Sequence, residues 1–104
     1  MNELFNDQIK QALNIPNLRT QGDTPDTDMV YCRFYDPADG WEWYVLEAEA
    51  KEDGDYFFHA LIKGTTTELA YYLLSNLTAV TATPPLIRDI DFQPMTLGKV
   101  KQLL

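Results

Sequence analysis

The chain has 104 residues, of which 45% are hydrophobic and 12% aromatic, and its formal net charge at pH 7 is −8. We expect a single domain over residues 1–104 that buries roughly two-thirds of the surface of the unfolded chain. The charge excludes direct binding to nucleic acid or to an anionic membrane, because both need a basic surface. Neither a signal peptide nor a run of about 18 apolar residues is present, so we expect a cytoplasmic protein.

The first element is predicted to be an amphipathic helix over residues 1–15. Apolar residues recur there at helical spacing, Asn2 is a candidate cap, and Pro16 lies just beyond the end. Residues 16–28 mix proline, glycine, aspartate and threonine without periodicity, which is typical of a surface loop. This loop links the helix to the predicted sheet.

Residues 29–73 are predicted to form a four-stranded antiparallel β-meander. Runs over 29–35, 41–50 and 56–63 have the composition of strands, and the turn sequences DPADG and KEDGD separate them. The fourth run, TELAYYL over 67–73, is assigned as a strand, although the longer stretch ELAYYLLSNL also fits a helix.

Residues 74–104 are predicted to form a C-terminal arm of short helices and extended segments that packs on the sheet. Ser75 is a candidate cap for a short helix that ends before the prolines at 84 and 85, and Thr96 is a candidate cap for a last helix. Four apolar residues of that helix are expected to face inward: Leu97, Val100, Leu103 and Leu104. The predicted fold class is therefore α+β, with an N-terminal helix, a four-stranded meander and C-terminal short helices.

The stretch DGWEWYVLEAE, residues 39–49, places Trp41 and Trp43 on one face of its strand. The other face is expected to carry Glu42, Tyr44, Leu46 and Ala48. A sheet with apolar groups on both faces needs cover on both faces. We expect the terminal helices on one face and partial cover on the other, which leaves an aromatic patch rimmed with acid as a candidate binding site. For most of these rings, however, burial in the core is the favoured role, and the exposed patch is the alternative.

Acidic residues are concentrated between Asp23 and Asp55, where eleven acidic residues stand against two basic ones, a local net charge of −9. Such charge keeps a small domain soluble, and it also suits contact with a basic partner. Four of the acidic residues between Asp23 and Asp55 are candidate binding residues: Glu49, Glu52, Asp53 and Asp55.

The sequence carries no recognisable catalytic, cofactor or metal motif. His59 is the single histidine and Cys32 the single cysteine, which excludes a metal site built on several imidazoles and an intramolecular disulfide. HExxH, GxSxG and glycine-rich phosphate loops are absent. We therefore predict no catalytic residue, no cofactor and no metal site, and we expect Cys32 and His59 to be packed residues. A carboxylate-dependent enzyme is the less favoured alternative, built on Glu47, Glu68, Arg88 and Asp89.

Arg88 and Asp89 are candidates for a specific polar role. Adjacent residues of an extended segment point in opposite directions, so each needs a separate partner. Apolar neighbours indicate that the segment lies against the sheet. We expect Arg88 to pair with Glu68 or Glu47 and to anchor the C-terminal arm, and the alternative is that Arg88 and Asp89 bind a partner.

From about Val30 to the C-terminus the chain resembles a family of small bacterial domain-of-unknown-function proteins carried by plasmids, phages and integrated elements. The resemblance rests on the order of several elements: a VxxxF-like first strand, the run WEWY followed by Glu47, Phe57 with Phe58, ELAYY at 68–72, Ser75, Leu77, and PLIRDIDFQP at 85–94. The chain departs from the family pattern at Ala70, where glycine is expected, and at Ile87, where glutamate is expected. The resemblance implies a cytoplasmic accessory protein of a mobile element and no established activity.

Together these features predict a non-catalytic protein-interaction module, such as a host-interaction or anti-defence factor that uses its acidic surface. A basic host or element-encoded protein is the predicted partner, with no direct nucleic-acid binding and no membrane contact. The alternative is a small-ligand-binding domain that uses an aromatic sheet face.

Overall fold

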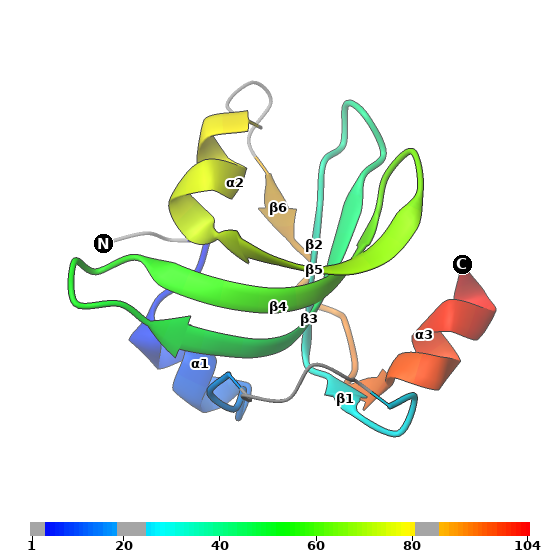
Figure 1. Ribbon diagram of the computed structural model, residues 1–104, viewed down its shortest axis with the longest axis horizontal. Coiled ribbons are helices and arrows are strands. Elements are labelled where there is room, and N and C mark those ends of the chain that lie inside the picture. The colour runs from blue at the N-terminus through cyan, green and yellow to red at the C-terminus, as the bar shows by residue number, and fades with distance from the viewer. Residues whose placement is uncertain (1–3, 19–24, 81–85) are drawn as a thin grey trace.

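The computed structural model describes residues 4–18, 25–80 and 86–104, and gives only the backbone of residues 78–80. Within these ranges the chain forms three short helices and seven strands (Figure 1). The helices are α1 (Asp7–Ala12), α2 (Leu74–Val80) and α3 (Leu97–Leu103). The strands are β1 (Met29–Val30), β2 (Cys32–Tyr35), β3 (Glu42–Ala50), β4 (Tyr56–Lys63), β5 (Thr67–Leu73), β6 (Ile87–Arg88) and β7 (Met95–Thr96).

The main sheet has five strands in the order β5-β4-β3-β2-β6, and every neighbouring pair is antiparallel. This confirms the predicted α+β class with an antiparallel sheet. The predicted four-stranded meander accounts for β2 to β5, and the sheet gains a fifth strand from the C-terminal arm. In that strand Arg88 pairs with Phe34 and Ile87 with Tyr35, so β6 occupies the edge that a four-stranded sheet would leave open.

The predicted strand over 29–35 is divided in two. Met29 and Val30 leave the main sheet and pair with β7 as a separate two-stranded ribbon. The predicted strand over 56–63 matches β4, and residues 67–73 form strand β5 rather than a helix, as predicted. The KGT turn explains β5, because it returns the chain directly alongside β4 and each residue of β5 finds a partner there.

Two apolar clusters lie on the two faces of the sheet. The first contains Phe5, Ile15, Cys32, Phe34, Trp43, Val45, Ala48, Tyr56, Phe58, Ala60, Leu74, Leu77 and Leu86. The second contains Val30, Tyr44, Leu46, Leu61, Leu97 and Val100. Cys32 belongs to the first cluster, and burial raises the pKa of its thiol to about 12, so the thiol is a protonated core group as expected.

A β-bulge in β3 changes which side chains share a face. Val45 pairs with Ala60 and Glu47 with His59, so Leu46 is an extra residue on β3. Beyond a bulge the alternation of side chains is shifted by one position. Ala48 therefore packs in the first cluster with Trp43 and Val45, and its predicted place beside Tyr44 was wrong.

Helix α1 is shorter than the predicted range 1–15. The side chain of Asn6 caps it by accepting a hydrogen bond from the backbone N–H of Ile9 at 3.0 Å, whereas the predicted cap Asn2 lies outside the described residues. Asn14 has a positive φ of 58°, a backbone conformation that does not continue an α-helix, so the predicted end at residue 15 is not reached.

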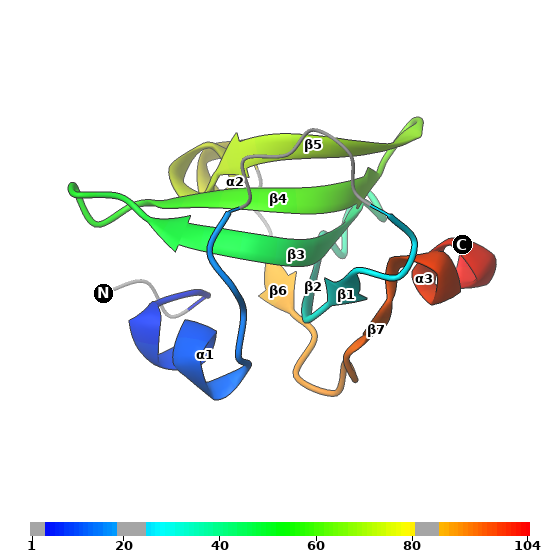
Figure 2. The ribbon, with the colours of Figure 1, turned by 60° about the horizontal axis from the view of Figure 1, so that its bottom comes forward.

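The terminal helices pack on different apolar clusters, and so on opposite faces of the sheet, which corrects the expectation that they share one. Figure 2 shows them near opposite ends of β3, with α1 at the left and α3 at the right. Residues around α1 pack on the first cluster, whereas Leu97 and Val100 of α3 belong to the second. Thr96 caps α3 as predicted, accepting a hydrogen bond from the N–H of Lys99 at 3.2 Å. Leu103 is 64% exposed and Leu104 is exposed as well, so their predicted inward orientation was wrong, because the short helix extends past the sheet.

Candidate functional site

The residues proposed from the sequence lie at three separate places. The two tryptophans lie at the start of β3, with Trp41 just before the strand. The four acidic residues lie at the other end of β3 and in the turn that follows it: Glu49, Glu52, Asp53 and Asp55. Glu49 is six positions from Trp43 along β3 and eight from Trp41, which corresponds to about 20 to 26 Å of extended strand. Arg88 and Asp89 lie on and just after the edge strand β6, so the structure does not assemble one site from all eight residues.

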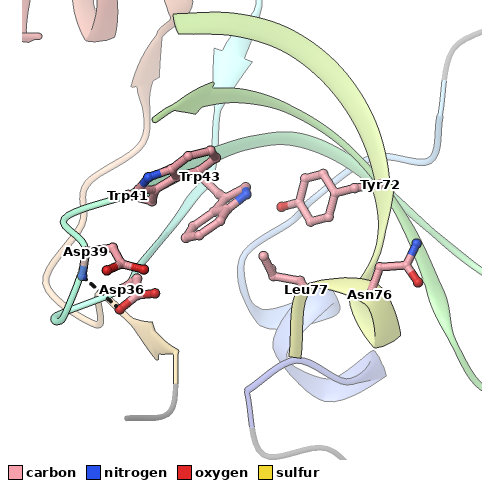
Figure 3. Close-up of a pocket in the computed structure, with 7 residues that line it drawn as sticks. All are labelled: Asp36, Asp39, Trp41, Trp43, Tyr72, Asn76 and Leu77. Carbon is pink, nitrogen blue, oxygen red and sulfur yellow. Dashed lines mark hydrogen bonds between the residues drawn. The ribbon is translucent and has the colours of Figure 1, made fainter. Parts of the chain in front are cut away.

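A pocket of about 340 Å³ opens beside the two tryptophans (Figure 3). Its walls come from two stretches of the chain that are distant in sequence: the β2–β3 turn with the start of β3, and the end of β5 with the first turn of α2. Seven residues line it: Asp36, Asp39, Trp41, Trp43, Tyr72, Asn76 and Leu77. Small-ligand sites in proteins span roughly 300 to 1,000 Å³, so this pocket is large enough to enclose one side chain or one small molecule.

The two tryptophans of the pocket differ in burial although their rings are neighbours. The ring centroids are 6.2 Å apart and the ring planes form an angle of 36°. Trp43 is 6% exposed and is a core residue, whereas Trp41 is 39% exposed. The Trp41 ring lies over Gly64, where a Cβ atom would stand 2.6 Å from three of the ring atoms. The absence of a side chain at Gly64 therefore holds open the space in which the exposed indole lies.

Tyr72 brings a buried hydroxyl group to the pocket. Its ring stacks on Phe58 at a centroid distance of 5.2 Å, and Figure 3 shows the hydroxyl directed from β5 toward Trp43. Among the described residues this hydroxyl has no hydrogen-bond partner, and burial raises the pKa of Tyr72 well above its ordinary value. The phenol therefore stays protonated and keeps an unused donor and acceptor. A ligand with a polar group at this place would satisfy an otherwise unpaired buried group.

Two carboxylates lie on the opposite side of the pocket from Tyr72 (Figure 3). Asp36 is 6% exposed, and its Oδ1 accepts hydrogen bonds from the backbone N–H groups of Ala38 at 2.9 Å and of Asp39 at 3.3 Å. Gly40, with φ of 78°, completes this turn. In the described part of the chain no lysine or arginine forms an ion pair with Asp36 or Asp39. The turn thus presents negative charge beside aromatic rings without an internal cation.

Asp55 differs from the other acidic candidates because it has a structural role. Its Oδ1 accepts hydrogen bonds from the N–H groups of Tyr56 at 2.8 Å and Ser75 at 3.1 Å, and its Oδ2 accepts one from Ser75 Oγ at 2.5 Å. Partial burial favours a higher pKa for Asp55, but these hydrogen bonds outweigh it and hold the pKa below its ordinary value. Asp55 therefore joins the β3–β4 turn to the first turn of α2. Glu49, Glu52 and Asp53 are exposed.

Arg88 was predicted to form the ion pair that anchors the C-terminal arm, but in the structure Arg33 forms ion pairs of this kind. Arg33 donates from Nε and Nη2 to Glu42 Oε1 at 2.9 and 2.6 Å, and from Nη1 to Asp89 Oδ2 at 3.0 Å. Arg88 forms no ion pair with Glu47 or Glu68 among the described residues, and its Nε is buried without a partner. The prediction failed because Arg88 faces the first apolar cluster beside Phe34, whereas Arg33, one position away in the pairing of β2 with β6, faces the carboxylates.

Glu47, Glu68, Arg88 and Asp89 do not form the cluster that a carboxylate-dependent enzyme would need. The Oε1 of Glu47 lies 3.2 Å from Nδ1 of His59, and His59 stacks on Tyr71 at 4.4 Å, so His59 is the packed residue that we expected. Glu68 is exposed on β5, three positions from Tyr71 along the strand, a distance of about 10 Å. Within the described ranges, no group of three histidine, cysteine or carboxylate side chains is arranged to hold a metal ion.

The pocket contains residues that sequence reasoning missed. Asp36 and Asp39 flank the turn directly before Trp41, so the short stretch DPADGW carried a signal for their proximity. Tyr72 and Leu77 carried no such signal, because β5 and α2 lie beside the tryptophans only in the folded sheet, about 30 positions further along the chain.

Comparisons with protein-family models, curated proteins and solved structures found no significant match to this chain. None of the helices in the described ranges has the length and apolar character needed to cross a membrane.

Proposed function

We propose that this chain is a non-catalytic interaction module that binds a basic protein partner, as an accessory protein of a mobile element acting in the cytoplasm. The observation that carries the proposal is the pocket beside Trp41, where aromatic rings lie opposite the carboxylates of Asp36 and Asp39 and no described cation neutralises them. Binding surfaces commonly combine exposed aromatic residues with charge that the partner complements. A host-interaction or anti-defence role is the form of this function that the resemblance to mobile-element proteins favours.

Charge supports a basic partner. The net charge of −8 leaves an excess of negative potential around the molecule, and such a field accelerates encounter with a positively charged partner. Glu49, Glu52 and Asp53 contribute to that field from the far end of β3, whereas Asp39 contributes beside the pocket. Residues that steer encounter and residues that hold the complex therefore occupy different parts of the surface.

A second candidate is a domain that binds a small cationic ligand. The pocket volume of about 340 Å³ favours it, because that volume fits a small molecule as well as a single side chain. Such a ligand would be steered less strongly than a basic protein, because the steering grows with the charge of the ligand.

The test is a kinetic comparison with a peptide rich in arginine and lysine, using a glutamine-substituted peptide of the same length as the control. Association with the basic peptide is expected to slow steeply between low and physiological salt, because exposed charges are screened over about 8 Å at 0.15 M ionic strength. Replacing Glu49 and Glu52 with Gln and Asp53 with Asn should slow association and leave dissociation unchanged. Asp55 is left intact because it ties the turn to α2.

Asp39→Asn is expected to act mainly on dissociation, because Asp39 lines the pocket. Equal binding of the basic and the glutamine-substituted peptide, or a rate of association that does not depend on salt, would contradict the proposed function.

A further inference from the structure

We propose that the pocket beside Trp41 binds the guanidinium group of an arginine side chain presented by the basic partner. This inference rests on the proposed function and specifies what its central contact recognises. It follows from the kinds of polar group in the pocket, from the arrangement of its rings and from the sides on which the acceptors lie.

The polar groups of the pocket call for a ligand that donates hydrogen bonds. The carboxylates of Asp36 and Asp39 only accept, and the buried hydroxyl of Tyr72 has an acceptor that no described residue uses. The amide of Asn76, the remaining polar side chain of the lining apart from the two indoles, is directed away from the tryptophans and Tyr72 in Figure 3. A cation with N–H groups therefore matches both the charge and the hydrogen-bonding capacity of the site. A quaternary ammonium ion would supply charge alone and would leave the Tyr72 oxygen unpaired.

The rings favour a flat cation with an apolar stem. Trp41 is exposed at the mouth of the pocket, Trp43 and Leu77 are buried residues of its wall, and all three offer apolar surface to an aliphatic stem. A guanidinium group is planar, weakly hydrated and able to stack on an aromatic face. Lysine can also lie over a ring, but its ammonium group is strongly hydrated and loses more on entering such a site.

The acceptors lie on two sides of the Trp43 ring, which distinguishes arginine from lysine. Figure 3 shows the Tyr72 hydroxyl on the side of β5 and α2, and Asp36 and Asp39 on the side of the β2–β3 turn. A guanidinium carries five N–H donors that diverge in one plane, so one group can donate in both directions. An ammonium carries three donors on a single atom and satisfies acceptors on one side at a time.

The experiment follows the two indole N–H resonances of the protein by NMR, because both tryptophans of the chain line this pocket. The probes are four end-blocked peptides, Gly-Xaa-Gly, in which Xaa is arginine, citrulline, lysine or trimethyllysine. Citrulline is the neutral counterpart of arginine with nearly the same shape. The arginine peptide is expected to shift both indole resonances, lysine and trimethyllysine to bind about tenfold more weakly, and citrulline to leave both resonances in place.

Two variants test the roles of named residues, with Glu52→Gln at the far end of β3 as the matched control. Tyr72→Phe keeps the ring and removes the hydroxyl, and it should weaken binding of the arginine peptide about tenfold. Its thermal stability should not fall, because the hydroxyl has no partner among the described residues of the free protein. Gly64→Ala should weaken binding by displacing the Trp41 ring, although Gly64 does not line the pocket. Glu52→Gln should weaken binding of this small probe far less than either pocket variant, because Glu52 lies outside the pocket and acts only through a long-range field that salt screens.

Citrulline binding as tightly as arginine would overturn the proposal, and so would a Tyr72→Phe variant that loses stability and keeps its affinity. If free arginine binds more tightly than the blocked peptide, the ligand of the pocket is a small guanidino compound, and the proposal that the arginine belongs to a protein partner is wrong. If the arginine peptide leaves the indole resonances in place while the longer basic peptide still binds in a salt-dependent way, this inference fails and the proposed function stands. If neither peptide binds, the proposed function fails.

Discussion

Arg33→Met and Arg88→Met form a matched pair of substitutions, because each removes a guanidinium and keeps an unbranched apolar stem. Arg33 bridges Glu42 on β3 and Asp89 beyond β6, and its guanidinium lies 4.7 Å from the Tyr35 ring centroid. Partial burial favours a higher pKa for Glu42, but hydrogen bonds, first of all from Arg33, outweigh it and lower that pKa. The half-buried network should therefore contribute more to stability than an exposed ion pair does.

We expect Arg33→Met to lower the free energy of unfolding by about 2 kcal/mol, between the values typical of exposed and of buried pairs. Arg88→Met should cost under about 1 kcal/mol, because Arg88 forms no ion pair with any residue that the structure describes. Urea denaturation measures both, and Arg33→Lys should recover only part of the loss because an ammonium cannot reproduce the fork of contacts. If Arg88→Met proves the more costly change, Arg88 is the anchor after all.

At the level of elements, the β3–β4 turn and α2 are joined through Asp55 and Ser75. Asp55 acts as a cap for α2 although it is 20 positions away in sequence, because it accepts hydrogen bonds from the N–H and the hydroxyl of Ser75 in the first turn of that helix. Asp55→Asn should therefore lower stability at pH 7 by about 1 kcal/mol, as the loss of a helix cap does. Glu52→Gln, an exposed change in the same turn, serves as the control and should have little effect.

The pH dependence of this contact follows from the lowered pKa of Asp55. A carboxyl group whose pKa is lower in the folded than in the unfolded chain stabilises the fold above its unfolded pKa of about 3.9. That contribution is lost as the pH falls through the folded pKa. The stability difference between the parent protein and Asp55→Asn should thus be constant from neutral pH to about pH 5 and shrink below about pH 4. A difference that stays constant to pH 2 would show that the charge of Asp55 has no part in the contact.

At the scale of the whole molecule, the dimensions and the net charge predict opposite effects of salt on folding and on binding. The molecule measures 32 × 31 × 25 Å and carries a net charge of −8. At 0.01 M ionic strength the screening length is about 30 Å, so every charge acts across the entire molecule, whereas at 0.15 M it is about 8 Å. Low salt should therefore destabilise the fold through mutual repulsion of the carboxylates.

We expect the melting temperature to rise by a few degrees, equivalent to about 1 kcal/mol, between 0.01 and 0.15 M sodium chloride. Over the same range the association with a basic partner should slow, because salt screens attraction between molecules as it screens repulsion within one. Thermal melts monitored by circular dichroism provide the measurement, with sucrose in place of salt as a control for nonspecific effects. A melting temperature that falls with added salt would show that internal ion pairs outweigh the repulsion.

The sequence by itself determined the elements whose cause is local. Strand β4 and strand β5 were predicted with their observed bounds, and Thr96 was identified as the cap of α3, because hydrophobic alternation, turn residues and capping side chains act within a few positions of one another. Cys32 and His59 were also predicted as packed residues, since each lies within an apolar run. The acidic character that suggests a basic partner is likewise a property of composition.

Only the tertiary structure decided which distant residues meet. Three features depend on strand register: the bulge at Leu46, the addition of β6 to the sheet, and the position of Arg33 rather than Arg88 beside the carboxylates. A shift of one residue in register moves every side chain of a strand to the other face of the sheet. The pocket depends in addition on the packing of β5 and α2 near the β2–β3 turn, which places Tyr72 opposite Asp36 and Asp39 (Figure 3). Its residues are remote in sequence, so their contact is specified by the packing of the whole fold and by no local pattern.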